Sequence, residues 1–114
     1  MRLTYAMAAM CIWTSVAWAE EDRSSGTLYA PHCKSLLSAP KNTFMEGMCL
    51  GMLQGFAGVG RGLPAAIRFC QPQDNPYKDL LGAVVRFLDA HPERLNEKFG
   101  VLALAALREA YPCP

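Results

Sequence analysis

Cysteine and histidine are the residue types in this 114-residue chain that could carry redox, metal or acid–base chemistry. The five cysteines and two histidines are Cys11, Cys33, Cys49, Cys70, Cys113, His32 and His91. Structural zinc sites usually take their cysteine or histidine ligands in pairs about two to four residues apart. No two cysteines here have that spacing, and the histidines lie far apart in the sequence. We therefore expect no metal site and no cofactor.

Neither histidine has the sequence context of a catalytic base. His91 precedes Pro92 in an expected turn, where a capping or solvated role is the better interpretation, and His32 has no obvious carboxylate partner nearby. The glycine-rich run 58–62 lacks the Lys-Ser/Thr pair of a phosphate-binding loop, and no serine stands in a nucleophile motif. The sequence therefore favours a binding protein, with no catalytic residues, over an enzyme.

The first 19 residues have the pattern of a secretory signal peptide. Arg2 gives a basic start, an apolar run follows to residue 16, and Ala-Trp-Ala at 17–19 matches a cleavage site. The competing interpretation is a membrane anchor, but the uncharged run is at the short limit for a span of roughly 20 residues. We expect residues 1–19, with Cys11, to be removed and the mature chain to have no membrane attachment. Residues 20–27 would then form a flexible tail and residues 28–114 the folded domain.

The mature chain is expected to keep four cysteines. An even number of cysteines in a short exported chain is most simply a disulfide framework. The net charge of the full chain is +1, so no polybasic surface for nucleic acid is expected.

Apolar residues recur at helical spacing in four segments, and no segment alternates with the period of a strand. The expected helices cover 28–37, 44 to a glycine-rich end at 58–64, 76–91 and 96–111, with a further helical turn at 65–69. Brief loops separate them. The pattern predicts an all-α fold, a small four-helix up-down domain whose thin core needs crosslinks.

Local signals place the helix ends. Thr43 and Glu46 have the spacing of a capping box for the second helix. Asn75 is the expected cap of the third helix, with Pro76 as its first residue. Asn96 is the expected cap of the fourth.

Glycines mark one face of the second helix. Gly47, Gly51 and Gly55 recur every four residues, so another backbone could approach closely there, and we expect a crowded helix contact. A neighbouring apolar face is formed by Phe44, Met45, Met48, Met52 and Phe56. Core packing is the preferred interpretation of this face, and an adaptable binding face is the alternative.

The helix order indicates how the cysteines pair. Cys33 and Cys49 lie at similar distances on either side of the turn at 38–43, so an antiparallel hairpin places them level. Cys70 follows the second helix and Cys113 the fourth, at the same end of an up-down bundle. We predict the disulfides Cys33–Cys49 and Cys70–Cys113; a Cys33–Cys113 pair is the main competitor.

Residues 70–113 contain an ordered set of short motifs: Cys70-Gln71-Pro72, Leu80, Val84-Val85-Arg86-Phe87-Leu88, His91-Pro92-Glu93, Ala106-Leu107 and Tyr111-Pro112-Cys113. In their order and spacing these motifs resemble the Rap/Tai family, the immunity proteins of type VI secretion amidase toxins. Upstream, the segment 49–55 resembles the family's Cys-x-Gly-Tyr-x-x-Gly, with Met52 in place of the aromatic residue.

The resemblance implies a small, disulfide-linked helical protein of the periplasm, often a homodimer. Its relatives bind a cognate peptidoglycan-cleaving amidase and occupy the substrate cleft. We expect the partner surface on the polar edge of the third helix and the following turn, comprising Lys78, Arg86, Asp89, His91, Glu93 and Arg94. The alternative for these six residues is a solvated rim. The alternative for the whole protein is a periplasmic structural or chaperone-like helical protein without a toxin partner.

Overall fold

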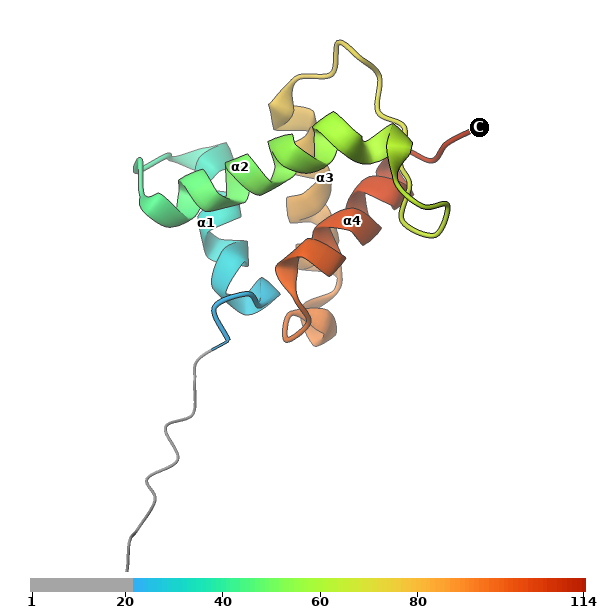
Figure 1. The fold of residues 1–114 in the computed structure, drawn as a ribbon. Coiled ribbons are helices and arrows are strands. Elements are labelled where there is room, and N and C mark those ends of the chain that lie inside the picture. Colours follow the sequence, from blue (N-terminus) through green and yellow to red (C-terminus); the bar gives the residue numbers. More distant parts are fainter. Residues whose placement is uncertain (1–21) are drawn as a thin grey trace, which may run out of the picture.

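The computed structural model describes residues 22–114; the expected signal peptide lies outside the described residues. Four α-helices form the fold of this part (Figure 1): α1 (Gly26–Ser38), α2 (Phe44–Val59), α3 (Tyr77–Ala90) and α4 (Phe99–Ala110). Two 3-10 helices, η1 (Gly60–Gly62) and η2 (Pro92–Arg94), follow α2 and α3. Across residues 22–114 the only extended pairing is one isolated bridge. The predicted all-α, four-helix fold is confirmed.

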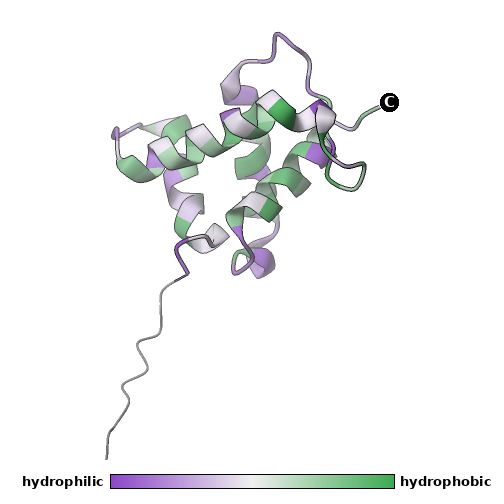
Figure 2. Cartoon of the chain, in the orientation of Figure 1, coloured by the Kyte–Doolittle hydropathy of each residue, from purple (hydrophilic) through white to green (hydrophobic). Residues whose placement is uncertain are grey.

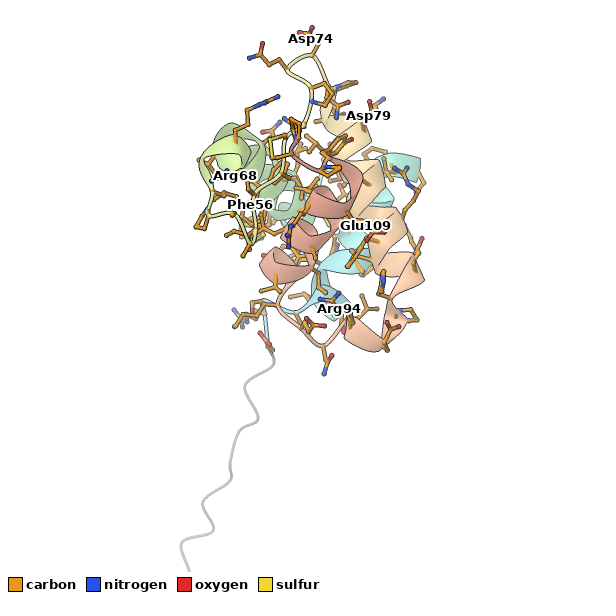
Figure 3. The ribbon with its side chains drawn as sticks, turned by 90° about the vertical axis from the view of Figure 1, so that its right-hand side faces the viewer. Phe56, Arg68, Asp74, Asp79, Arg94 and Glu109 are labelled. Atoms are coloured by element: carbon orange, nitrogen blue, oxygen red, sulfur yellow. A yellow bond between two sulfur atoms is a disulfide. The ribbon has the colours of Figure 1, made fainter. Side chains whose placement is uncertain are left out.

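The helix α2 lies across the other three helices. In Figure 1, α1 rises, α3 descends and α4 rises again, while α2 crosses at the top. The view turned by 90° in Figure 3 looks along α2, and α3 and α4 still run vertically. This arrangement leaves one long side of α2 facing away from the rest of the domain.

Two disulfides fasten this arrangement, and both predicted pairings are confirmed. Cys33 and Cys49 are fully buried and join α1 to α2. Cys70 and Cys113 join the segment after η1 to the residues after α4. Beside the second bond, the Cys70 amide donates a 2.8 Å hydrogen bond to the Tyr111 carbonyl. The first crosslink therefore holds α2 to α1, and the second holds the segment after η1 to the C-terminal residues.

The core lies between α3, α4 and the inner sides of α1 and α2. The apolar stripe predicted for the third helix is buried throughout, and Tyr29 of α1 stacks on Phe99 of α4 with ring centroids 4.4 Å apart. Figure 2 shows hydrophobic residues along all four helices. The largest side chains that are fully buried are Phe69, Phe99, Leu53, Leu81, Leu102 and Leu107.

The helix starts are partly as predicted. The capping box of α2 is confirmed: Thr43 Oγ1 accepts from the Glu46 amide at 3.2 Å, and the Glu46 carboxylate accepts from the Thr43 amide at 3.3 Å. The cap expected at Asn75 is wrong, because Pro76 has extended backbone, is itself the N-cap, and α3 begins at Tyr77.

The start of α4 is held by a distant segment instead of a local cap. Asn96 was expected there, but Lys98 is the N-cap residue and has no side-chain cap. The Phe99 amide donates to the Ser24 carbonyl at 2.7 Å, and the Gly26 amide donates to the Glu97 carbonyl at 2.9 Å. Residues 24–27 therefore differ from the expected flexible tail, since they are bonded to the segment before α4 and α1 already begins at Gly26.

The segment 65–69 is a turn and not the expected helical turn. The Ile67 amide bonds to the Pro64 carbonyl at 2.9 Å, and the chain then extends to place Phe69 in the core. The Phe69 ring lies against Gly60, where a Cβ atom would come within 2.7 Å of it. The glycine at 60 is therefore what lets this loop close onto the end of α2.

Candidate functional site

A groove runs between α3 and α4 on the side of the molecule seen in Figure 3. It has a volume of about 400 Å³ and is lined by Ala83, Arg86, Phe87, Ala90, His91, Ala106, Glu109 and Ala110. Four of these eight residues are alanines, whose short side chains leave the hollow between the helices. Arg86 and Glu109 bring opposite charges to it. The groove therefore offers an apolar floor with charged edges.

Of the six residues predicted for the partner surface, two lie against the Phe87 ring and a third lines the same groove. The His91 ring stacks on Phe87 with centroids 4.1 Å apart, and the Arg94 guanidinium lies 5.5 Å from the Phe87 centroid. Arg86 lines the same groove as Phe87 and His91. A cation over an aromatic face is attracted by the ring quadrupole. We call Arg86, Phe87, His91 and Arg94 the α3 rim.

Hydrogen bonds hold the α3 rim in place. His91 Nδ1 lies 2.8 Å from the Phe87 carbonyl oxygen and donates to it, so the imidazole is fixed by backbone and not by a carboxylate. Arg94 makes two bonds to the Glu97 carboxylate, at 2.7 and 3.1 Å. This bond lowers the pKa of the Glu97 carboxyl and raises the pKa of Arg94. A pair held in this geometry presents a fixed shape to a partner, which reduces the entropy lost on binding.

The other three predicted residues lie elsewhere. Asp89 pairs with Lys34 of α1 at 2.6 Å. Glu93 is exposed in η2. Lys78 is exposed in the first turn of α3, 13 residues before His91, which is about 20 Å along a helix. The six residues therefore do not form one compact patch. Phe87 and Glu109 also line the groove and were not among the predicted residues. Glu109 joins the groove only through the packing of α4 on α3, which the sequence pattern did not reveal.

The outer side of α2 is the second prominent surface. The residues Phe44, Gly47, Met48, Gly51, Gly55, Gly58 and Val59 fall within about 120° of one another at 100° per residue. All seven are exposed, with Phe44 at 79%, Val59 at 53% and Met48 at 39%. We call this set the glycine face.

The crowded helix contact expected for the glycines is wrong. A Cβ atom added at Gly47, Gly51, Gly55 or Gly58 would meet nothing within 4 Å. Met45, Met52 and Phe56 do pack against the core, as preferred for that side of the helix. Phe44 and Met48 turn outward instead, which fits the alternative interpretation of an adaptable binding face.

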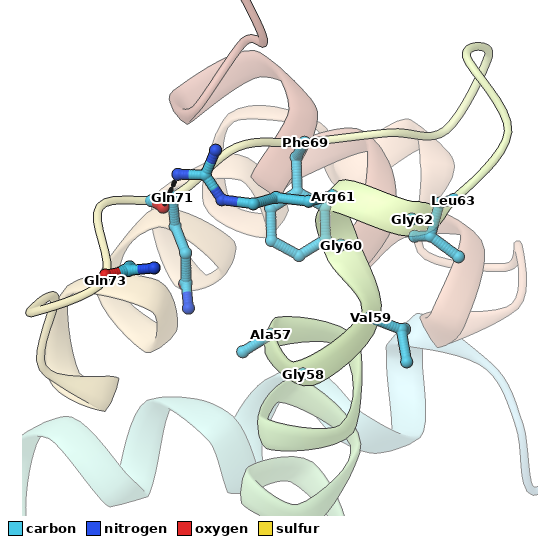
Figure 4. Close-up of a pocket in the computed structure, with 10 residues that line it drawn as sticks. All are labelled: Ala57, Gly58, Val59, Gly60, Arg61, Gly62, Leu63, Phe69, Gln71 and Gln73. Atoms are coloured by element: carbon cyan, nitrogen blue, oxygen red, sulfur yellow. Dashed lines mark hydrogen bonds between the residues drawn. The ribbon is translucent and has the colours of Figure 1, made fainter.

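A cavity of about 570 Å³ opens at the C-terminal end of the glycine face (Figure 4). Gly58 and Val59 belong to both, and the Phe69 ring and Leu63 add apolar walls. Arg61 crosses it and donates a 3.0 Å hydrogen bond to the Gln71 carbonyl. The cavity is lined mostly by glycine and apolar side chains, so it suits an apolar group.

The described residues provide shape and apolar surface more than reactive groups. Over residues 22–114, no three histidine, cysteine, aspartate or glutamate side chains lie close enough together to hold a metal ion. None of the helices in that range has the length and apolar character that a membrane crossing requires. The described residues thus define a small helical domain crosslinked by two disulfides.

A family comparison assigns the chain. The sequence model described as Rap1a immunity proteins matches residues 24–113, nearly all of the described part. The chain belongs to the Rap1a immunity protein family, which confirms the resemblance seen in its sequence. Membership implies an immunity protein that binds a toxin, and it favours a binding role over a catalytic one. No curated protein and no solved structure matches the chain.

Proposed function

We propose that this protein binds a cognate type VI secretion toxin, a peptidoglycan amidase, and inhibits it by occupying its active-site cleft in the periplasm. The observation that carries the proposal is the family match over residues 24–113. The α3 rim is the surface through which we expect it to act. Glu93, Asp89 and Lys78 remain expected toxin contacts outside this rim.

The disulfides support the periplasm as the place of action. Both cysteine pairs are bonded in the structure. Disulfides persist in oxidising compartments such as the bacterial periplasm and are rare in the cytosol. The N-terminal segment has the signal-peptide pattern that would direct the chain there.

The contacts within the α3 rim support binding with little rearrangement. Preorganised inhibitors lose less entropy on binding, and their interface backbone moves little. The 3-10 turn η2 follows α3 directly, and the Phe87, His91 and Arg94 contacts make it rigid. Arginine and aromatic residues are also the types that most often dominate binding energy at protein interfaces.

Co-expression tests the function. A candidate amidase encoded beside this chain is directed to the periplasm with and without the protein, and cell lysis and co-purification are scored. We expect protection from lysis, a stable complex and loss of peptidoglycan hydrolysis by the purified amidase. Lysis that continues, together with no complex for any neighbouring amidase, would overturn the proposal.

A matched pair of arginine variants tests the surface. Arg86→Ala removes the rim arginine, and Arg108→Ala removes an exposed arginine of α4 that lines a separate hollow with Arg68 and Pro112. We expect amidase affinity to fall at least tenfold for Arg86→Ala and to change less than twofold for Arg108→Ala. Equal affinities for both variants would show that the toxin binds elsewhere.

A further inference from the structure

The cavity at the C-terminal end of α2 has the size of a ligand site. Its volume of about 570 Å³ lies within the range of about 300–1,000 Å³ that is usual for small-ligand pockets. Gly58 and Gly62 line it, and a Cβ atom at either position would meet nothing within 4 Å, so these glycines leave its space open. The α3 rim does not use this cavity, whose role is therefore unassigned.

Among the described residues that line the cavity, Arg61 alone is charged. Figure 4 shows its side chain passing from η1 across the cavity to the loop at Gln71, whose carbonyl accepts the 3.0 Å hydrogen bond. Over residues 22–114 the ion pairs of 4 Å or less join other residues, so Arg61 has no carboxylate partner there. Its remaining N–H donors are free for an anion, and a guanidinium matches a carboxylate with two parallel hydrogen bonds.

Two carboxamides line the cavity together with this cation. The side chains of Gln71 and Gln73 point from the loop toward Ala57 of α2 in Figure 4. A carboxamide both donates and accepts hydrogen bonds, so it is complementary to a peptide group. The Oε1 atom of Gln71 is buried and has no hydrogen-bond partner among the described residues. A half-turn of its carboxamide would present that oxygen to the cavity, where a ligand N–H can satisfy it.

Apolar walls complete the cavity. They are formed by Ala57, Val59, Leu63 and the Phe69 ring. Phe69 is held in the core and is 1% exposed, whereas Val59 is 53% exposed, so the apolar surface extends from the interior to the opening. A ligand side chain that covers this surface removes it from water, which favours binding. The cavity thus combines an unpaired cation, peptide-like polar groups and apolar surface.

We propose that this cavity binds the carboxy-terminal end of a peptide chain whose last residue is apolar. The terminal carboxylate pairs with the Arg61 guanidinium, and the last amide group bonds to the carboxamides of Gln71 and Gln73. The last side chain contacts Leu63 and Phe69. Capture of a free chain terminus is a recurring mode of peptide recognition. A phosphate group carries more charge than one arginine balances, and a fatty acid would leave both carboxamides without partners.

Two kinds of molecule end in this way. The last residue of a protein tail has the L configuration, whereas a peptidoglycan stem peptide ends in D residues. Both present a carboxylate beside an amide and a small apolar side chain, so the cavity fits this shared chemistry. The proposal does not depend on the toxin, because residues 57–73 build the cavity and residues 86–94 the α3 rim.

Titration of the purified protein followed by nuclear magnetic resonance, without toxin, tests the site. The probes are the tripeptide N-acetyl-Ala-Ala-Leu with a free carboxylate, its C-terminal amide, its isomer ending in D-Leu, and octanoate. We expect saturable shift changes at residues 57–63 and 69–73, and at least tenfold tighter binding of the acid than of the amide. Tighter binding of the L or the D acid supports the proposal and identifies a protein tail or a stem peptide, respectively. Equal binding of acid and amide, octanoate binding as tightly as the peptides, or no saturable change at these residues would overturn it.

Two arginines give a matched pair of variants that tests the carboxylate contact. Arg61→Gln removes the cation of the cavity, and Arg108→Gln removes an exposed cation of α4. Arg61→Gln should weaken binding of the peptide acid at least tenfold and leave binding of the peptide amide within twofold, because the amide lacks the charge that Arg61 recognises. Arg108→Gln should leave both within twofold. Equal losses for acid and amide in Arg61→Gln, or equal effects of the two variants, would overturn the assignment.

Two glycines of α2 give a second pair, which tests the cavity by filling it. Gly58→Leu places a side chain at the cavity wall and should weaken binding of the peptide acid at least tenfold. Gly47→Leu, on the same helix but outside the cavity, should leave binding within twofold. Both variants should fold, because a Cβ atom at either position meets open space and leucine is a better helix former than glycine. Wild-type affinity in a folded Gly58→Leu variant would show that the peptide binds elsewhere and would overturn the proposal.

Discussion

The Ser35 hydroxyl of α1 donates a 2.5 Å hydrogen bond to the Glu46 carboxylate of α2. The same carboxylate accepts from the backbone amides of Lys41 and Thr43, at 3.0 and 3.3 Å. Between them, Asn42 takes a positive φ of 56°, a conformation that asparagine tolerates better than most residues. One buried carboxylate thus joins the end of α1, the turn and the first turn of α2.

This arrangement predicts a stability that is sensitive to acid. The hydrogen bond from Ser35, followed by those from the turn, holds the pKa of Glu46 below its ordinary value of 4.5. The unfolded state therefore binds a proton more readily, and the stabilisation is complete above about pH 4.5 and lost as the pH falls through the lower folded-state pKa. We expect the Tm of the wild type to fall in that window, measured by circular dichroism.

Two variants isolate the Glu46 contribution. Glu46→Gln cannot ionise, so its Tm should be lower than that of the wild type at neutral pH and should change less below about pH 4.5. Glu109→Gln, at an exposed carboxylate of α4, should keep the acid dependence of the wild type. Parallel melting profiles for Glu46→Gln and the wild type would contradict the assignment.

Loss of either disulfide should destabilise the fold. The two bonds close loops with sequence separations of 16 and 43 residues, which in the chain-entropy model correspond to about 3 and about 4 kcal/mol. Cys70→Ala with Cys113→Ala should lower the free energy of unfolding by about 4 kcal/mol. Cys33→Ala with Cys49→Ala should cost about 3 kcal/mol and an added cavity term, since both are fully buried. Urea denaturation measures both, and a change below about 1 kcal/mol for either pair would contradict the prediction.

Two glycines of one segment should respond oppositely to alanine. At Gly60 a Cβ atom would lie 2.7 Å from the Phe69 ring, so Gly60→Ala should lower the free energy of unfolding by roughly 1–3 kcal/mol through overpacking. At Gly47 a Cβ atom meets open space, so Gly47→Ala should raise it by up to about 1 kcal/mol through helix propensity. Thermal and urea melts compare the two. A destabilised Gly47→Ala variant would show that the glycine face is covered in the folded protein.

The Lys34–Asp89 ion pair should contribute little to stability. Both side chains are more than half exposed, at 56% and 53%, and such pairs typically contribute below about 1 kcal/mol. Asp89→Ala should therefore melt within a few degrees of the wild type. Any loss of toxin affinity in this variant then reports on contact with the toxin and not on unfolding. A fall in the free energy of unfolding above about 2 kcal/mol would contradict this.

Much of the fold follows from local features of the sequence. The apolar stripe of α3 repeats at helical spacing, and Thr43 with Glu46 forms the predicted capping box. The disulfide pairing followed from helix order. Cysteines at similar distances on either side of a helical hairpin lie side by side, and cysteines that follow alternate helices lie at the same end of the domain. These features depend on contacts within a few residues or on connectivity, so they can be predicted from the sequence alone.

Other features depend on how the helices pack, and local sequence patterns do not predict this packing. The starts of α3 and α4 were misplaced because asparagines offered plausible caps, whereas α4 is held by the Ser24 carbonyl from the other end of the domain. The groove beside the α3 rim forms only because α4 packs against α3.

The glycine repeat of α2 shows the difference most clearly. The sequence determined that glycines share one side of a helix, since spacing alone places them there. Whether that side faces the core or solvent was decided by the direction in which α2 crosses the other helices, and by Cys33–Cys49, which fixes its rotation. Burying a face lined by glycine contributes little free energy, so its composition favours neither the core nor the solvent. Leu53 and Cys49 on the opposite side decide the orientation, because Leu53 is a large buried side chain and Cys49 is bonded to Cys33.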